Sequence, residues 1–387
     1  MSTPSPRAQA ALRFVMAIGI VNLFADMTYE GGRGAVGAFL QHLGASGAMV
    51  GIIAGGGELA GFAIRSISGI IADRTGAYWI DAWIGYTINM LCVPALALVG
   101  SWPAAAGLVV GERVGRGIRK PVVAAVLAQA GAEIGGGRAF GLNEMLDQIG
   151  ATTGPLIVAL AIARSGSFSV GFGVLIVPAI VTLLALVPAS IASRTLTPKN
   201  PNAEGPALRD RAAFWRYAAG GAFLAAGLVD FALIAFRFQR DHIASASMIS
   251  VEFAAAMAVA AVSAPLFGRW FDRAGAGVMT LAIVLTSLAT ALAFLGNGAF
   301  AMTGAALWGV GTAVTDSLVL ALVASVITQR RGATTFGLYD LVFGIAWFLG
   351  SAVAGLLLDR SLVGLVVFSV ALQLLAIPLF LTRRVAR

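Results

Sequence analysis

The chain alternates long apolar stretches with short polar turns. Crossing a bilayer takes about 20 predominantly apolar residues in helical form, and twelve stretches of this kind follow one another along the sequence. We expect helices near residues 13–39, 47–72, 78–101, 103–128, 138–163, 168–190, 214–238, 246–270, 277–297, 299–327, 334–358 and 361–382. The pattern predicts an all-α membrane protein with twelve transmembrane helices.

One connection between these stretches is long and polar. It covers residues 191–213 and contains Thr197-Pro198-Lys199-Asn200-Pro201-Asn202. Clusters of Pro and polar residues are typical of linkers. We therefore predict an N-terminal six-helix bundle at 1–190, a cytoplasmic linker at 191–213 and a C-terminal six-helix bundle at 214–387.

One polar turn occurs twice. The segment Gly69-Ile-Ile-Ala-Asp73-Arg74-Thr-Gly76 returns 199 residues later as Gly268-Arg-Trp-Phe-Asp272-Arg273-Ala-Gly275. An Asp in such a turn can cap a helix, and it can pair with an Arg so that one orientation of a carrier is favoured. We assign a gating role to these positions: Gly69, Asp73, Arg74, Gly76, Gly268, Asp272, Arg273 and Gly275.

The repeat extends beyond the turn. Phe-Gly-Leu-Asn-Glu at 140–144 returns as Phe-Gly-Leu-Tyr-Asp at 336–340, and Gly154 returns as Gly350, both at an offset of 196. An internal repeat of this length has to be identified first, because it determines which fold the sequence predicts. The protein consists of two homologous halves.

The pattern Gly-x-x-x-Asp-Arg-x-Gly between the second and third helix of each half resembles the signature loop of the major facilitator superfamily. The resemblance covers essentially the whole chain, although Ala77-Tyr78-Trp79 and Ala276-Gly277-Val278 follow where the family usually has basic residues. It implies two six-helix bundles related by a pseudo-twofold axis, with a central site and alternating access.

Composition narrows the class further. Hydrophobic residues make up 59% of the chain and charged residues 11%, whereas soluble domains have about 25% charged residues. A water-soluble protein is thus excluded. The single cysteine, Cys92, lies in an apolar segment, which excludes disulfides and thiolate metal clusters.

The net charge of +8 is explained by topology. With the N-terminus inside, sixteen Lys and Arg residues fall on the cytoplasmic side, and only Arg164, Arg240 and Arg360 fall on the other. This asymmetry predicts a multi-pass protein of the cell (inner) membrane with both termini cytoplasmic. We expect the lipid bilayer as its surroundings, no nucleic-acid partner, no cleaved signal peptide and a monomer.

Charges within the first predicted helix suggest proton coupling. Asp26, Glu30 and Arg33 stand at i, i+4 and i+7 on one face. A carboxylate at membrane depth beside a second acid can take up a proton. Asn22 and Tyr29 add polarity to this helix. We assign Asp26 and Glu30 to proton coupling and Asn22, Tyr29 and Arg33 to a substrate cavity; a structural Glu30–Arg33 ion pair is the alternative.

The predicted helix 103–128 carries a cluster of cations. Arg113 precedes a Gly-x-Gly pair and resembles the family's helix 4 motif, which implies a membrane Arg that assists proton movement. Arg113, Arg116 and Lys120 share a face. We place Arg116 in the substrate cavity, and we read Arg119 and Lys120, near the cytoplasm, as interfacial anchors or substrate contacts.

The predicted helix 138–163 carries a glycine pattern. Gly141, Gly150 and Gly154-Pro155 resemble the antiporter motif of drug exporters, with Val158 where a further Gly is expected. Glycines would let this helix cross the predicted helix 246–270 closely. Two acids on the same helix, Glu144 and Asp147, are further candidates for proton coupling or are ion-pair partners of the Arg residues.

The second half repeats one spacing of the first. Asp230 and Arg237 stand seven apart, as Asp26 and Arg33 do, and we assign them to the substrate cavity. The two histidines, His42 and His242, are expected in loops, so we predict no metal site.

Other chemistry is excluded by missing motifs. The chain has no phosphate-binding Gly-x-x-x-x-Gly-Lys-Ser/Thr, and its Gly-rich runs do not follow a strand. We expect no enzyme and no cofactor, with a proton gradient as the energy source. The sequence predicts a proton-coupled exporter of a small organic compound. An organic-anion carrier (uptake or exchange) that uses the membrane arginines, and a non-transporting membrane sensor or scaffold, are the alternatives.

Overall fold

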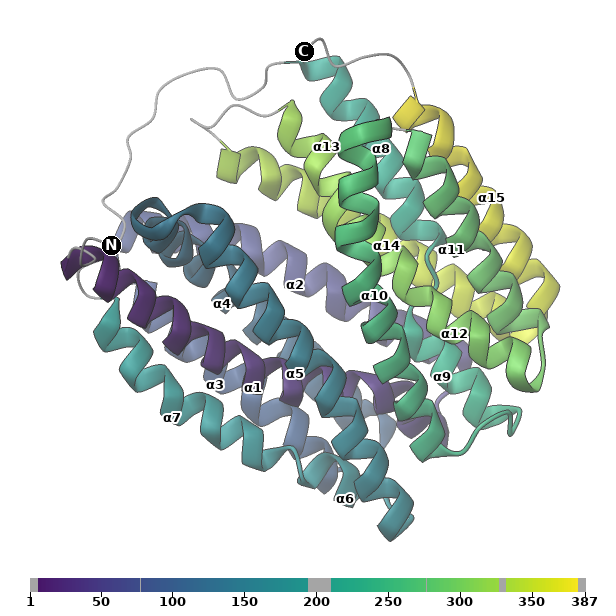
Figure 1. Ribbon diagram of the computed structural model, residues 1–387. Helices are drawn as coiled ribbons and strands as arrows, with labels where there is room; N and C mark the ends of the chain where they lie inside the picture. Colours follow the sequence, from purple (N-terminus) through teal and green to yellow (C-terminus); the bar gives the residue numbers. More distant parts are fainter. Residues whose placement is uncertain (1–5, 77, 194–209, 276, 327–331, 382–387) are drawn as a thin grey trace. The chain divides into compact units, whose positions relative to one another are not determined.

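A computed structural model describes residues 6–76, 78–193, 210–275, 277–326 and 332–381, and these residues form helices joined by short turns (Figure 1). Two short elements differ from the α-helices: η1 is a 3₁₀ helix and η2 a π-helix. The elements are α1 (Pro6–His42), α2 (Gly47–Thr75), α3 (Tyr78–Ala95), η1 (Leu96–Leu98), α4 (Trp102–Ile134), α5 (Gly136–Ser165), α6 (Phe168–Gly173), α7 (Ile176–Ala192), α8 (Arg211–Gly227), α9 (Phe231–Arg240), α10 (Ala246–Ala274), α11 (Gly277–Leu295), α12 (Gly298–Ala313), η2 (Val314–Val319), α13 (Leu320–Ser325), α14 (Gly332–Arg360) and α15 (Leu362–Leu381).

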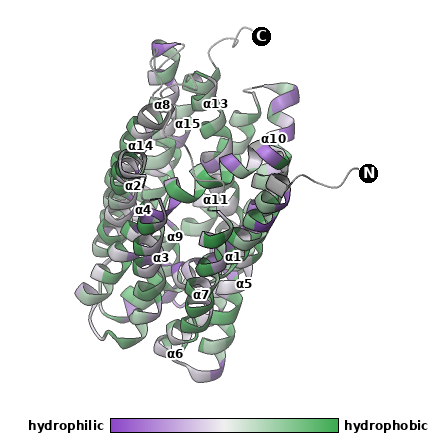
Figure 2. Cartoon of the chain, turned by 90° about the vertical axis from the view of Figure 1, so that its left-hand side faces the viewer, coloured by the Kyte–Doolittle hydropathy of each residue, from purple (hydrophilic) through white to green (hydrophobic). Residues whose placement is uncertain are grey.

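Eleven helical stretches among the described residues are long and apolar enough to cross a membrane. Each corresponds to a predicted span, and most residues along them are hydrophobic (Figure 2). The remaining predicted span, 103–128, lies within α4, which has 33 residues and five charged side chains between Glu112 and Lys120. At 1.5 Å per residue α4 is about 50 Å long, more than the roughly 30 Å of a hydrocarbon core. The predicted all-α fold is confirmed.

The predicted helix 214–238 is interrupted in the structure. The backbone leaves the helical conformation after Gly227, and the carboxylate of Asp230 caps the helix that follows by accepting a backbone N–H at 2.9 Å. The carbonyl oxygen of Gly227 accepts hydrogen bonds from Ser369 Oγ (2.5 Å) and Gln373 Nε2 (3.1 Å). Because both broken ends find partners, the interruption is a stable feature of this span.

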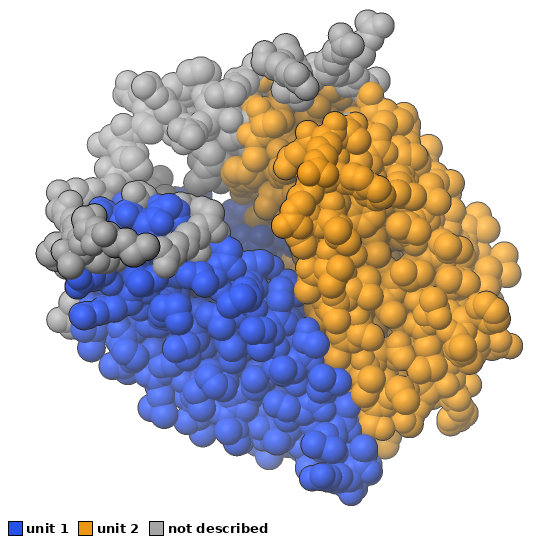
Figure 3. All heavy atoms as spheres, in the orientation of Figure 1, with its two compact units in different colours: residues 1–35, 60–202 blue, residues 36–59, 203–387 orange. Residues whose placement is uncertain are grey.

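The chain forms two compact units (Figure 3). Unit 1 consists of residues 1–35 and 60–202, and unit 2 of residues 36–59 and 203–387. Residues 36–59, which we placed in the N-terminal bundle, thus belong to unit 2. Most of the predicted linker, 194–209, lies outside the described residues, so its role as a boundary stays a prediction.

The core of unit 1 is an apolar cluster shared by α1, α3, α4, α5 and α7. Its fully buried side chains include Phe14, Tyr86, Met90 and Leu186. Since lipid chains are as apolar as these side chains, such helices associate by close packing and polar contacts.

Glycines bring α5 onto α1. A Cβ at Gly150 would collide with the carbonyl oxygen of Leu23, and one at Gly154 with that of Met27. These two glycines therefore serve a contact within unit 1; the predicted crossing with helix 246–270 concerns a helix of unit 2 and stays a prediction. A Cβ at Gly141 would meet no atom within 4 Å, so this member of the pattern makes no close crossing. Pro155 lies inside α5.

Unit 2 contains the same close crossing. A Cβ at Gly350 of α14 would collide with the carbonyl oxygen of Ala226 in α8. Gly350 follows Gly154 by the offset of 196 found in the sequence, and Ala226 follows Met27 by 199, the offset of the duplicated turn. The internal repeat is therefore visible in the helix packing.

A second glycine contact in unit 2 joins the start of α2 to the end of α14. A Cβ at Gly51 would collide with the carbonyl oxygen of Ser351. The Asp359 carboxylate accepts hydrogen bonds from the backbone N–H groups of Gly47 and Ala48, both at 2.9 Å. A carboxylate at a helix N-terminus is favoured by the helix dipole and satisfies free N–H donors. These contacts fix residues 47–59 within unit 2.

We predict that Gly154→Ala lowers the thermal stability of the protein, because the new methyl group meets the Met27 carbonyl oxygen. Over-packing of this kind costs about 1–3 kcal/mol. Gly141→Ala is the matched control: it gains the same helix propensity, about 1 kcal/mol, and meets open space. Thermal unfolding in detergent, followed by tryptophan fluorescence, compares the two. Equal melting temperatures for both variants would contradict the close α1–α5 crossing.

Candidate functional site

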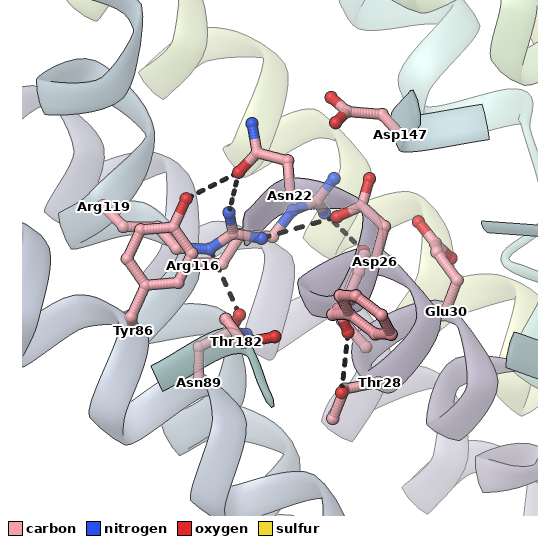
Figure 4. A network of polar contacts seen from close by, with 12 residues as sticks. Asn22, Asp26, Thr28, Glu30, Tyr86, Asn89, Arg116, Arg119, Asp147 and Thr182 are labelled. Atoms are coloured by element: carbon pink, nitrogen blue, oxygen red, sulfur yellow. Dashed lines mark hydrogen bonds and ion pairs between the residues drawn. The ribbon is translucent and has the colours of Figure 1, made fainter. Parts of the chain in front are cut away.

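A buried polar network lies in unit 1 among α1, α3, α4 and α5, with Arg119 of α4 at its centre (Figure 4). The Arg119 side chain is 5% exposed, and its Nη2 lies 3.5 Å from Asp26 Oδ1. Nε and Nη1 donate to the amide oxygens of Asn89 (3.2 Å) and Asn22 (3.4 Å). The guanidinium carbon stands 4.6 Å from the ring centre of Tyr86, a cation–π contact. Each side of the group thus has a partner.

A chain of amides extends the network to a second carboxylate. Tyr86 Oη donates to Asn22 Oδ1 at 2.6 Å, and Asn22 Nδ2 donates to Asn143 Oδ1 at 2.9 Å. Asn143 Nδ2 in turn donates to Asp147 Oδ2 at 2.9 Å. Asp147 of α5 is therefore connected to the Arg119–Asp26 pair through uncharged groups.

Asn89 also holds an acid of α4. Its Nδ2 donates to Glu112 Oε1 at 2.7 Å, while its Oδ1 accepts from Arg119. The other Glu112 oxygen lies 3.4 Å from Arg113 Nη1. One amide of α3 thereby fixes an anionic and a cationic group of the same neighbouring helix.

Three guanidinium groups meet at the hydroxyl of Tyr29, and we call Tyr29, Arg33, Arg113 and Arg116 the Tyr29 cluster. The hydroxyl oxygen accepts from Arg113 Nη1 (2.5 Å), Arg33 Nη1 (3.3 Å) and Arg116 Nη1. The guanidinium carbons of Arg116 and Arg113 also lie 4.3 and 5.1 Å from the Tyr29 ring centre. Tyr29 is 1% exposed, so these contacts form inside the helix bundle.

Three acids of the network lie together on one side of it. Figure 4 shows Asp26, Glu30 and Asp147 together, and Asp26 interacts electrostatically with both other carboxylates. Glu30 Oε2 lies 3.6 Å from Arg33 Nη1, so the ion pair that we gave as the alternative to a proton-coupling role is present. Glu144 instead accepts from Gln148 Nε2 at 2.8 Å on the exposed side of α5. Of the four acids assigned to proton coupling, three therefore share one site, and Glu144 lies beside Asp147 on the exposed side of α5.

The central role of Arg119 in the network was not recognised from the sequence. We read it as an anchor or substrate contact near the cytoplasm, and the structure makes it the buried partner of Asp26. Glu112, Asn89, Tyr86 and Asn143 were not predicted as site residues either. A signal was present: Tyr86 and Asn89 stand three apart, and so form a polar stripe on one face of an otherwise apolar helix.

Asp230 and Arg237 have different surroundings from Asp26 and Arg33. Asp230 caps α9, and Arg237 donates to the carbonyl oxygens of Ala293 and Gly296 (3.1 Å for Gly296). Arg237 also pairs with Asp241 at 3.3 Å. The equal spacing in the two halves thus does not give equal environments. The assignment of these two residues to a substrate cavity stays a prediction.

The two copies of the duplicated turn both end on a glycine with positive φ. Gly76 (φ +68°) and Gly275 (φ +70°) end α2 and α10 in the left-handed region, which favours glycine. Their N–H groups donate to the carbonyl oxygens four residues back, at 2.9 and 2.8 Å. Gly69 faces Pro121, whose Cβ would lie 3.6 Å from an added Cβ, whereas an added Cβ at Gly268 meets no atom within 4 Å.

The gating role itself is untested. The side chains of Asp73 and Arg74 lie outside the described part of the chain, and those of Asp272 and Arg273 are exposed. The assignment of the turns to gating stays a prediction. No group of three or more His, Cys, Asp or Glu side chains that could hold a metal occurs among the described residues.

No family model matches the chain. Relatives are the uncharacterized proteins Rv2265 of Mycobacterium tuberculosis (strain ATCC 25618 / H37Rv) and Mb2288 of Mycobacterium bovis. Each is 35% identical over 389 residues, which covers 98% of this chain and 95% of the relative.

Solved transporter structures are similar over nearly the whole chain. An inward-facing bacterial homolog of the human lysosomal transporter Spinster has a TM-score of 0.69 and 17% identity, and it covers 99% of this chain and 100% of its own. A mutant of the peptide transporter POT has a TM-score of 0.73 and 15% identity, with 98% of each chain covered. The human organic anion transporter MFSD10 has a TM-score of 0.66 and 15% identity, with 96% and 99% covered. The chain belongs to the family of these mycobacterial proteins, and its fold is that of the major facilitator superfamily.

Proposed function

We propose that the chain is a proton-coupled secondary active transporter that moves a small organic compound across the cell membrane by alternating access. The observation that carries this proposal is the ion pair inside a transmembrane bundle between the buried Arg119 and the partly buried Asp26, whose side chain is 22% exposed. The fold supports it, because the solved structures with this fold reported above are transporters. A transporter fold also agrees with the prediction that the chain is not an enzyme.

The ion pair supplies a site at which a proton changes helix contacts. Asp26 belongs to α1 and Arg119 to α4, and the Arg119 guanidinium is also held by Asn22 and Asn89. A proton on Asp26 removes its attraction to Arg119, while the amides keep the guanidinium in place. Protonation therefore weakens one contact between α1 and α4 and favours a state in which these helices are arranged differently.

The cost of the pair argues against a purely structural role. Moving a charged side chain to the membrane interior costs at least a few kcal/mol, and apolar residues often replace a buried ion pair without loss of stability. A network of four helices that keeps an acid and a base together at this depth is what proton transfer requires.

A second candidate function is an organic-anion carrier, and a specific observation favours it over the predicted exporter. The glycines behind the export prediction pack α5 against α1, which is a structural contact within unit 1. The Tyr29 cluster instead brings three cationic groups to one point. Among the similar structures, MFSD10 is an organic anion transporter.

We predict that Asp26→Asn abolishes proton coupling, because the amide keeps the shape of the carboxylate but cannot exchange a proton near neutral pH. Purified protein in liposomes with an imposed pH gradient and an internal pH dye is given cationic, neutral and anionic compounds. Flux triggered by a compound in the wild type should vanish in Asp26→Asn. Glu133→Gln, an exposed carboxylate near the end of α4, is the control and should retain flux. Full gradient-driven transport by Asp26→Asn would remove Asp26 as the proton carrier.

We predict that Arg119→Gln lowers thermal stability, because it leaves Asp26 without its ion-pair partner. Breaking a fully buried pair from one side costs about 3–5 kcal/mol, and we expect a smaller loss here because the Asp26 side chain is 22% exposed. The double variant Asp26→Asn/Arg119→Gln removes both charges of the pair and should recover most of this loss. A double-mutant cycle of melting temperatures measures the coupling. Additive effects of the two substitutions would show that the pair contributes nothing beyond its separate residues.

A further inference from the structure

We propose that the Tyr29 cluster binds the oxyanion group, a carboxylate or a phosphate, of an organic substrate, and that the anion binds together with the proton. The proposal rests on the transport function above and names the substrate class of that site. It also gives the direction of coupling: the anion and the proton move the same way.

The geometry of the cluster fits an oxyanion better than the group that it now surrounds. A phenol oxygen is neutral and has two lone pairs, yet guanidinium groups of Arg33, Arg113 and Arg116 all point a nitrogen at it. A carboxylate or phosphate offers several acceptor oxygens and a negative charge, and guanidinium forks bind such groups bidentately. The Tyr29 hydroxyl therefore occupies the place that an oxyanion oxygen would take.

The Tyr29 cluster has a fixed part and a part that is accessible to a ligand. Arg113 and Tyr29 are buried, at 6% and 1% exposure, so their positions are set by the surrounding helices. Arg33 and Arg116 are partly exposed. An anion can thus approach from the side of Arg33 and Arg116 and meet the fixed Arg113 behind them.

Carboxylates of the protein compete with such an anion for the same guanidinium groups. Glu30 lies 3.6 Å from Arg33, and Glu112 lies 3.4 Å from Arg113. Asp26 interacts electrostatically with Arg116 as well as with Arg119. A proton on Glu30 or Asp26 weakens the hold of these acids on the cluster and leaves its charge to the substrate.

Among the described side chains whose contacts are given above, the charges of the network balance. Its basic groups are Arg33, Arg113, Arg116 and Arg119, and its acids are Asp26, Glu30, Glu112 and Asp147. The groups around Asp26 come from four helices. The cations are on α4: Arg116, Arg119 and the exposed Lys120. The acids are Glu30 on α1 and Asp147 on α5, with the exposed Glu144 beside Asp147, and α3 contributes the uncharged Tyr86 and Asn89.

The balance decides the sign of the coupling. With every acid ionised, four negative charges face four positive ones, and a bound anion leaves an excess negative charge in a medium where charge is costly. One proton on the acids restores neutrality. Proton and anion therefore strengthen each other's binding, and the coupling is reciprocal. An inward proton gradient would then drive uptake of the anion rather than export.

The test uses the full-length protein in detergent and four probes of similar size: benzoate, phenyl phosphate, benzylamine and benzyl alcohol. We expect the two anions, and not the amine or the alcohol, to raise the melting temperature. Benzoate should bind more tightly at pH 6 than at pH 8, and its own carboxylate stays ionised at both of these pH values. Anions that bind no better than the amine and alcohol, or benzoate binding independent of pH, would overturn the proposal.

Variants identify the site. Arg116→Gln should weaken benzoate binding about tenfold or more, the loss of one charge-assisted hydrogen bond. Arg164→Gln, an exposed arginine in the last turn of α5, is the control and should bind as the wild type does. Tyr29→Phe removes the competing hydroxyl and should tighten benzoate binding, a gain that loss of folding cannot imitate. Unchanged binding in both Arg116→Gln and Tyr29→Phe would place the anion elsewhere.

The liposome assay above separates this proposal from the proposed function. Proton flux triggered by benzylamine or benzyl alcohol, without anion binding at the cluster, would refute the anion site and leave the proton-coupled transporter standing. Anion binding that depends on Arg116, with no proton flux for any probe, would leave the site standing and refute proton-coupled transport. Flux with benzoate in which protons and benzoate enter together supports both.

Discussion

A guanidinium group placed at membrane depth must be given partners, and the structure of unit 1 follows from this requirement. Transfer of such an ion into a medium of low dielectric constant costs of order 20 kcal/mol before any compensation. Helix α4 brings Arg113, Arg116 and Arg119 into the bundle. The facing helices supply what these groups need: a carboxylate, amide oxygens and aromatic rings.

The same requirement explains the polar residues of helices that are otherwise apolar. Asn89 would be costly in the middle of α3 if it stood alone, but it accepts from Arg119 and donates to Glu112. Asn22 likewise connects α1 to α3 and α5. Every such contact ties two helices together, so the groups that could serve transport also determine how the bundle packs.

The two units have kept their packing and changed their chemistry. The glycine crossings at Gly154 and Gly350 are equivalent, and the helix ends at Gly76 and Gly275 share a positive φ and a hydrogen bond to the carbonyl four residues back. In unit 2, however, Arg237 donates to backbone carbonyl oxygens and to Asp241. The arginines at equivalent spacing in the two halves therefore have different partners: backbone carbonyl oxygens for Arg237 and the Tyr29 hydroxyl for Arg33.

Much of the fold was predictable from the sequence, because apolar stretches of membrane length and a duplicated turn are local signals. The shared face of Asp26, Glu30 and Arg33 was predictable for the same reason, since helical spacing alone sets it. Arg119 was misjudged because α4 continues to Ile134, so a residue expected near a helix end lies well inside.

The contacts between side chains of different helices could not be predicted from the sequence. The glycines of α5 indicate that another helix crosses closely, but they do not indicate which helix this is. That Arg119 meets Asp26, and that three arginines meet Tyr29, depends on the rotation of α1, α3 and α4 about their axes. Only the packed structure specifies these rotations.

The contact between α2 and α14 has a consequence for the history of the chain. The glycine face of α2 at Gly47 and Gly51 is covered by α14, a helix from the other half of the sequence. The internal repeat implies that a half-length chain was once duplicated. Since α14 is the repeat of α5, such an ancestor carried both the α2 face and the counterpart of the helix that covers it, and the present contact corresponds to one between two copies of that chain. The present chain would then have inherited the symmetric dimer interface of a smaller protein.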